Sequence, residues 1–172
     1  MLALLDAFIQ IVMRRLGPED LPDSSFLLGL ALAAYALAQL PTAGVVFGLT
    51  PTAALAIAVD CALLAGVFWL LLRFTGHAPR FRQTLTALAG TGALLALVQA
   101  PLVYLTKLAG AGGQSSAGPT LGLLALLLWS VIVQAHIASR ALSGGYGVGL
   151  AVALGYFILS YGISGIFSPQ AG

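Results

Sequence analysis

One acidic residue, Asp60, lies in the middle of an apolar run that extends from Pro51 to Leu72 and is long enough to span a membrane. A carboxylate at that depth costs on the order of 3 kcal/mol by insertion scales, so we expect it to face other protein groups or water. Intramembrane acids can carry a proton, bind a cation or bind a lipid headgroup. Asp60 is therefore the first candidate for a functional residue.

Several further polar residues lie near the depth of Asp60 when each apolar run is treated as a helix that rises about 1.5 Å per residue. On that scale Asp60 is roughly 14 Å from the nearer end of its run. The expected intramembrane polar cluster contains Asp60, Gln39, Gln99, Ser160 and Tyr156. Two interpretations remain open: a polar cavity centred on an ionisable Asp60, or interhelical hydrogen bonds that hold a bundle together.

A second pattern, Gly162-Ile163-Ser164-Gly165, matches the serine motif of intramembrane proteases, in which the serine pairs with a histidine. His136 differs from Ser164 by roughly 18 Å in depth at 1.5 Å per residue. A Ser–His pair needs contact at about 3 Å, so this pairing fails. The sequence contains no paired carboxylates, metal-ligand cluster or nucleotide motif elsewhere. We therefore expect no enzyme activity, no metal and no cofactor.

The composition places these residues in a membrane protein. Of 172 residues, 60% are hydrophobic and only 7% are charged, whereas soluble domains carry roughly 25% charged residues. A chain of this length cannot bury so much apolar surface in water, so the surplus must face lipid. The net charge of +2 comes from a few loop arginines and does not predict a nucleic-acid surface. The Ala/Leu/Gly-rich, Lys-poor composition favours a bacterial source.

Five apolar runs predict an all-α transmembrane bundle, since each approaches the ~20 residues that a helix needs to cross a bilayer. The runs comprise residues 26–47, 51–72, 85–105, 120–139 and 147–167. The first run has an alternative end at Leu40, because Pro41 disfavours helix at the residue before it.

The N-terminal residues 1–16 differ in kind from the five runs, because apolar and polar residues occupy separate helical faces. The apolar face contains Leu2, Leu5, Phe8, Ile9, Val12 and Leu16. Such a helix is too short to span and suits the membrane interface. The expected organisation is an interfacial helix at 1–16, an acidic linker at 17–25, a transmembrane domain at 26–167 and an outer tail at 168–172.

Basic residues fall almost entirely on one side of the predicted topology. That side carries Arg14, Arg15, Arg73, Arg80, Arg82 and Arg140. The other side carries Lys107 alone. The positive-inside rule therefore predicts a bacterial inner-membrane protein with its N-terminus inside and its C-terminus outside.

The loop between the second and third runs is a second candidate site. Arg73, His77, Arg80 and Arg82 lie within ten residues and could bind anionic headgroups or a cytoplasmic partner. The alternative is that these arginines only set the topology.

Small residues recur every four positions near the last run and predict close helix packing. One set contains Gly147, Ala151 and Gly155, and the other contains Gly145, Gly149 and Ala153. The spacing does not distinguish packing within the chain from contact between copies.

The five-span layout with its N-terminus inside resembles the YIP family of small membrane proteins. The resembling stretches are Phe81-Arg-Gln-Thr-Leu-Thr-Ala-Leu-Ala-Gly90 leading to Pro101, and Trp129-Ser130-Val131 through Ser139-Arg-Ala141. Of the family's N-terminal Asp-Leu-aromatic-Gly-Pro motif, only Gly17-Pro18 is present. The resemblance implies a non-enzymatic membrane protein that acts through partners or lipids, and it assigns no functional residue.

The sequence as a whole predicts an accessory or scaffold protein of the membrane, or an organiser of lipids. Its expected partners are membrane lipids and other membrane subunits or further copies of the chain, with no nucleic acid. The alternative is a small transporter or channel component that uses Asp60 to bind a proton, a cation or a headgroup.

Overall fold

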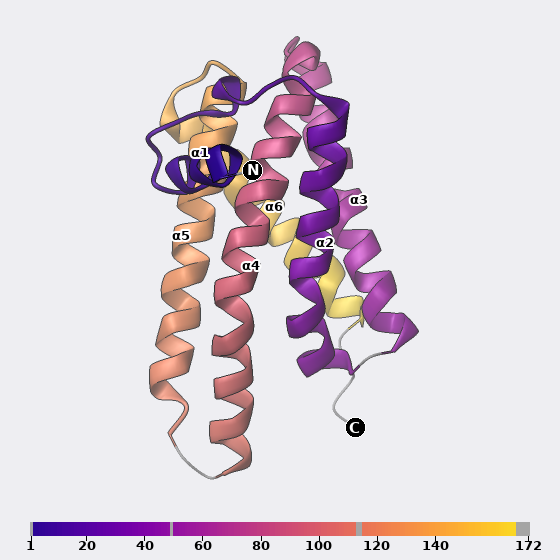
Figure 1. Cartoon of the computed structure of the whole chain (residues 1–172), viewed down its shortest axis with the longest axis vertical. Helices are drawn as coiled ribbons and strands as arrows, with labels where there is room; N and C mark the ends of the chain where they lie inside the picture. Colours follow the sequence, from indigo (N-terminus) through magenta and orange to yellow (C-terminus); the bar gives the residue numbers. More distant parts are fainter. Residues whose placement is uncertain (1, 49, 113–114, 168–172) are drawn as a thin grey trace.

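The structure is a computed structural model that describes residues 2–48, 50–112 and 115–167. Five long helices form a bundle, and a short helix lies across one end of it (Figure 1). The helices are α1 (Leu2–Val12), α2 (Ser25–Phe47), α3 (Pro51–Phe74), α4 (Phe81–Ala111), α5 (Ala117–Ala141) and α6 (Tyr146–Phe167). Two short 3₁₀ helices, η1 (Pro18–Asp20) and η2 (Ala78–Arg80), lie in the connections.

The helices α2 to α6 are each long and apolar enough to cross a membrane, which confirms the predicted all-α, multi-pass architecture. Each predicted run lies within one of them. The largest extension is in α4, whose 31 residues begin before and end after the predicted run. We refer to the end of the bundle that carries the six arginines as the Arg-rich end, and to the end that carries Lys107 as the opposite end.

Helix α2 does not stop before Pro41, so the alternative end at Leu40 is wrong. The helix continues to Phe47 with Pro41 inside it and exposed. A proline removes one backbone donor, yet the residues beyond it still pack, since Ala43 is buried. The helix ends at Gly48, whose positive φ of 73° suits glycine and whose N–H donates to the Gly44 carbonyl at 3.1 Å.

Capping fixes the other end of α2. The side chain of Ser24, the residue before the helix, accepts a hydrogen bond from the Leu27 N–H at 3.3 Å. Helix α3 starts with Pro51 at its first position, where the missing N–H costs no hydrogen bond.

The bundle packs most tightly around the start of α4. Eight consecutive residues there, 84–91, are all buried, so neighbouring elements surround this part of the helix. The core beside it contains Phe68, Leu85, Val133 and Ile137. Small side chains allow this closeness: a Cβ on Gly92 would lie only 2.7 Å from the Tyr35 ring.

Helix α1 packs against α4 and α5 rather than standing free of the bundle. Ile11 is fully buried in the main core, and Phe8 and Val12 pack against that core. The Phe8 ring lies directly over Gly90, where an added Cβ would meet it at 2.3 Å. The predicted apolar face is therefore divided, because Leu5 and Ile9 remain exposed while the contact with the bundle is centred on Ile11.

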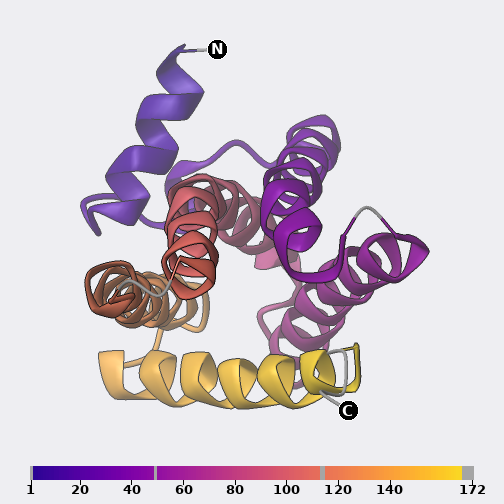
Figure 2. The same ribbon diagram turned by 90° about the horizontal axis from the view of Figure 1, so that it is seen from below.

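Helix α6 crosses the bundle obliquely. Figure 2 shows it lengthwise, whereas α2, α4 and α5 are seen almost end-on. Of the two small-residue faces, the one with Gly149 packs against α5: a Cβ there would lie 2.1 Å from the Ala135 carbonyl oxygen. Ala153 is fully buried on the same face. The other face, represented by Gly147, is exposed.

Candidate functional site

Asp60 is the hydrogen-bonding centre of three helices. Its Oδ2 atom accepts a bond from the Tyr35 hydroxyl at 2.7 Å and another from the Gln39 amide nitrogen at 3.2 Å. Its Oδ1 atom accepts a bond from the Ser160 hydroxyl at 3.4 Å. Donors from α2 and α6 therefore converge on one carboxylate of α3, and all three suit an acceptor-only group.

Helix periodicity explains why these side chains meet. Tyr35 and Gln39 are four residues apart, so they occupy one face of α2. Asp60 is nine residues into α3, and Gln39 is eight residues from the end of α2. The two helices run in opposite directions from a short connection, which brings both side chains to one depth of about 12–14 Å.

A cavity of about 450 Å³ lies beside Asp60. Helices α2, α3, α4 and α6 supply its lining, and Figure 2 shows these four helices around one region of the bundle. The polar lining side chains other than Asp60 are Gln39, Thr42, Gln99, Ser160 and Tyr161. The remaining lining residues are apolar, so the cavity combines a mainly apolar wall with several polar side chains, as ligand pockets commonly do.

Two hydroxyl groups at this site have no hydrogen-bond partner in the described part of the chain. They belong to Thr42, which lines the cavity, and to Tyr156, which is only 6% exposed. The Tyr156 hydroxyl lies close to Asp60 and Ser160, but Tyr156 is not one of the residues that line the cavity. Buried polar atoms usually find a partner, so the Thr42 oxygen in the cavity lining is available to a bound molecule.

The charge balance of the cavity is one-sided. None of its described lining residues is Lys, Arg or His, so Asp60 has no basic partner there. Lys107, the basic residue of the opposite end, instead donates from Nζ to the Val45 carbonyl at 2.7 Å, near the last turn of α2. Val45 is six residues from Gln39, or about 9 Å along the helix. The site therefore presents one negative group to anything that enters it.

The structure brings together much of the predicted polar cluster. Gln39 and Ser160 bond to Asp60, while Gln99 lines the cavity from α4 without a hydrogen bond to it. Sequence reasoning missed Tyr35 and Thr42. The sequence does indicate that Tyr35 and Gln39 share one helical face, because Tyr35 lies one turn before Gln39. The side chain of Ser164, the serine of the protease-like pattern, lies outside the described residues.

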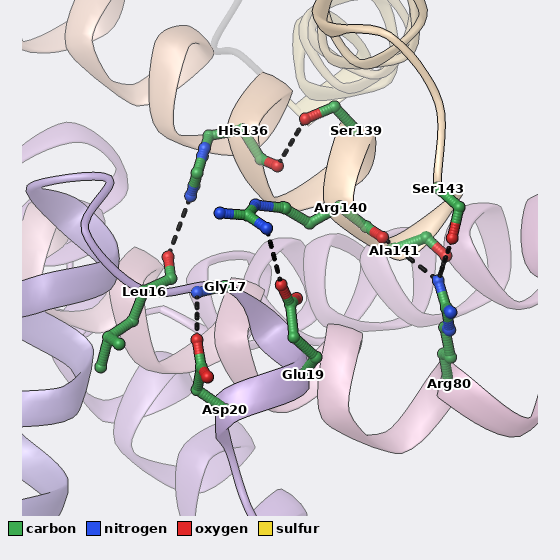
Figure 3. Close-up of polar contacts among 10 residues, drawn as sticks. All are labelled: Leu16, Gly17, Glu19, Asp20, Arg80, His136, Ser139, Arg140, Ala141 and Ser143. Carbon is green, nitrogen blue, oxygen red and sulfur yellow. Dashed lines mark hydrogen bonds and ion pairs between the residues drawn. The ribbon is translucent and has the colours of Figure 1, made fainter.

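The predicted loop site divides into residues with different surroundings. Arg80 donates from Nη1 to the Ala141 carbonyl at 3.2 Å and to the Ser143 hydroxyl at 2.5 Å, near the end of α5 (Figure 3). Arg82 pairs with Asp23 at 3.6 Å. These two cations are therefore engaged within the chain.

The other two members of the loop site, Arg73 and His77, have no ion pair with another segment in the described part of the chain. The Arg73 guanidinium lies 5.4 Å from the centre of the Trp69 ring, and both side chains are exposed. His77 is half-buried, and its Nδ1 atom has no partner in the described part of the chain. The loop therefore does not gather its four side chains around one point.

A strap of residues 14–24, which follows α1, is held to the Arg-rich end by polar contacts. Arg140 pairs with Glu19 at 3.2 Å, and His136 Nε2 lies 2.9 Å from the Leu16 carbonyl oxygen (Figure 3). Within the strap, the Gly17 N–H donates to Asp20 at 2.7 Å. The acidic linker therefore folds over the ends of α4 and α5, where its carboxylates meet the arginines.

Comparison of the chain with protein-family models, with curated proteins and with solved structures gives no match. The resemblance to the YIP family stays a prediction. The cavity around Asp60 combines a carboxylate, hydrogen-bond donors and space for a small molecule.

Proposed function

We propose that this integral membrane protein binds a small cation in the cavity beside Asp60 and acts as a small, non-enzymatic transporter or channel component. The observation that carries the proposal is a carboxylate with three hydrogen-bond donors, placed beside a cavity whose described lining contains no basic side chain. A cation in the cavity would supply the missing charge.

The energetics favour this reading of Asp60. An ionised side chain within a membrane span is costly unless it is paired or solvated, and such residues commonly mark ion or substrate pathways. The three donors of α2 and α6 stabilise the carboxylate by hydrogen bonding but add no positive charge. The remaining electrostatic need is met by a positively charged ligand rather than by another residue of the lining.

The proposal includes an orientation in a bacterial inner membrane. With the Arg-rich end inside, the cavity lies in the outer half of the bilayer, because its lining reaches Phe47 at the last residue of α2. A ligand would then enter from the outer side. The single Lys107 at that end is consistent with the low basic content of outer segments.

Asp60→Asn tests the function, because asparagine keeps the size and most hydrogen bonds but cannot carry a negative charge. We expect the purified variant in liposomes to lose cation binding and uptake while its detergent melting temperature stays equal or rises, since a costly charge has gone. Asp6→Asn is the matched control, because Asp6 is an exposed acid of α1 outside the cavity. Full cation uptake by Asp60→Asn would refute the proposal.

The second candidate is an accessory or scaffold role, which one observation favours. Asp60 joins α2, α3 and α6, as a purely structural hydrogen-bonding residue would. In that case Asp60→Leu costs only about 0.6 kcal/mol per lost intramembrane bond, and Asp60→Asn functions normally. Gentle purification from the native membrane would then yield a stoichiometric partner that both variants retain.

A further inference from the structure

We infer that the ligand of the cavity is an organic primary ammonium ion with an apolar body, an inference that rests on the proposed binding of a cation at Asp60. The first reason is size. The cavity of about 450 Å³ lies in the range of small-molecule pockets, roughly 300–1,000 Å³. A metal ion with six waters needs roughly 200 Å³, taking about 30 Å³ per water.

The second reason is the amount of charge. Asp60 is the only acid in the described lining, so the cavity offers one negative charge. Divalent metal sites use several oxygen ligands and commonly more than one carboxylate. In the described part of the chain, no three or more His, Cys, Asp or Glu residues are grouped to hold a metal. A ligand with a single positive charge therefore matches the site.

The third reason is the supply of hydrogen-bond acceptors. A primary ammonium group has three donors and no acceptor. Asp60 supplies one acceptor, and the partnerless hydroxyl oxygen of Thr42, which lines the cavity, supplies another.

The apolar wall accounts for the rest of the ligand. Val46, Phe47, Ile57 and Ile163 line the cavity between the polar group and the opposite end. Val46 is seven residues beyond Gln39 on α2, a distance of about 10 Å along the helix. The ammonium group therefore lies deep, beside Asp60, and the apolar body extends along this wall towards the opposite end.

The test uses the full chain in phosphatidylcholine nanodiscs and isothermal titration calorimetry. The probes are hexylammonium, hexyltrimethylammonium, hexanol and sodium ion. We expect hexylammonium to bind in a saturable 1:1 manner, at least tenfold more tightly than hexyltrimethylammonium, which lacks N–H donors. Hexanol should not bind, because it has no charge. Asp60→Asn should lose hexylammonium binding, and Asp6→Asn should keep it.

A second variant tests whether the Thr42 hydroxyl oxygen accepts a hydrogen bond from the ammonium group. Thr42→Val keeps the shape of the side chain and removes its oxygen. We expect it to weaken hexylammonium binding by about tenfold and to leave hexyltrimethylammonium binding unchanged. Equal binding of the two amines to the wild type would overturn the inference, because charge alone would then be recognised.

The outcomes separate this inference from the proposed function. Sodium binding that Asp60→Asn abolishes, without hexylammonium binding, would overturn the ligand class and keep the cation site. Binding of neither cation would overturn both. The source of the ammonium group is settled by adding phosphatidylethanolamine to the nanodiscs. Competition with hexylammonium would identify the lipid headgroup, and its absence would identify a soluble amine; both results support the ammonium class.

Discussion

The two ends of the bundle use their polar residues in different ways. At the Arg-rich end, Arg80, Arg82 and Arg140 each bond to another segment of the chain, and the strap folds across the helix ends. In the opposite half, Asp60 accepts three hydrogen bonds beside a cavity, and the Thr42 hydroxyl in the lining lacks a partner in the described part of the chain. These three cations meet their partners within the chain, whereas the carboxylate of the opposite half has hydrogen-bond donors but no basic side chain beside it in the described lining of the cavity.

Packing follows the same division. Around Gly90 the helices approach so closely that an added Cβ would overlap the Phe8 ring. Further along α4, Leu97, Val98 and Gln99 are all exposed. The comparison predicts that substitutions at the Arg-rich end change stability, while substitutions around Asp60 change binding.

The largest expected effect concerns which end lies inside. In a Cys61→Ala background, we expect a membrane-impermeant thiol reagent to label Ser115→Cys in intact cells and to leave Ala78→Cys unlabelled, because the arginines are retained inside. Disrupting the membrane should make Ala78→Cys reactive, which is the control for accessibility. If only position 78 is labelled in intact cells, the Arg-rich end lies outside and the predicted orientation is wrong.

The second effect concerns the contact between α5 and α6. Gly149→Ala places a Cβ against the Ala135 carbonyl, and backbone atoms cannot rotate away, so we expect a loss of about 3 kcal/mol in the free energy of unfolding. Gly147→Ala is the matched control, because nothing lies within 4 Å of its added Cβ. Detergent melting curves of both variants give the comparison. Equal melting temperatures would show that α6 does not pack as described.

The third effect concerns the docking of α1. Ile11→Ala removes a fully buried side chain, so we expect a loss of about 3 kcal/mol, within the range of such core truncations. Ile9→Ala should change stability by less than about 0.5 kcal/mol, because Ile9 is 43% exposed. The two variants are compared by thermal melting in nanodiscs. If both melt alike, α1 rests on lipid and not on the bundle.

The smallest effect concerns the ion pair of the strap. Glu19 and Arg140 are each about half exposed, so we expect a coupling energy of about 0.5 kcal/mol. A double-mutant cycle with Glu19→Gln and Arg140→Gln measures it, and the coupling should fall as salt is added. A coupling above about 2 kcal/mol would mean that this pair is a principal support of the Arg-rich end.

Much of the architecture could be predicted from sequence, because lipid exposure imposes long apolar runs and helices rise regularly. The regular rise of the helices predicts that Asp60, Gln39 and Ser160 lie at one depth, and the structure shows them in contact. The role of Tyr35 could not be predicted in this way. An aromatic residue in an apolar run has the same pattern whether its hydroxyl bonds to a neighbouring helix or it faces lipid.

The N-terminal segment shows a second limit. Its amphipathic pattern predicts a helix at an interface. The pattern does not determine which apolar side chains contact the bundle, because that depends on tertiary packing. Ile11 is buried and Ile9 is exposed although both are isoleucines of one short helix. Likewise, the bonds from Arg80 to the end of α5 depend on tertiary placement, which local charge patterns do not encode.

The unequal lengths of the helices have a consequence for the surrounding lipid. Helix α4 has 31 residues and α2 has 23, which correspond to about 46 Å and 34 Å. In Figure 1 the α4–α5 hairpin extends beyond the ends of α2 and α3. The hydrocarbon core of a bilayer is about 30 Å thick, which the apolar run 85–105 of α4 matches at about 32 Å, so the excess length of this helix extends beyond the hydrocarbon core. The polar residues that flank this run, among them Arg82 and Lys107, would then lie in the headgroup layers, and the tip of the hairpin would reach the water beyond the lipid.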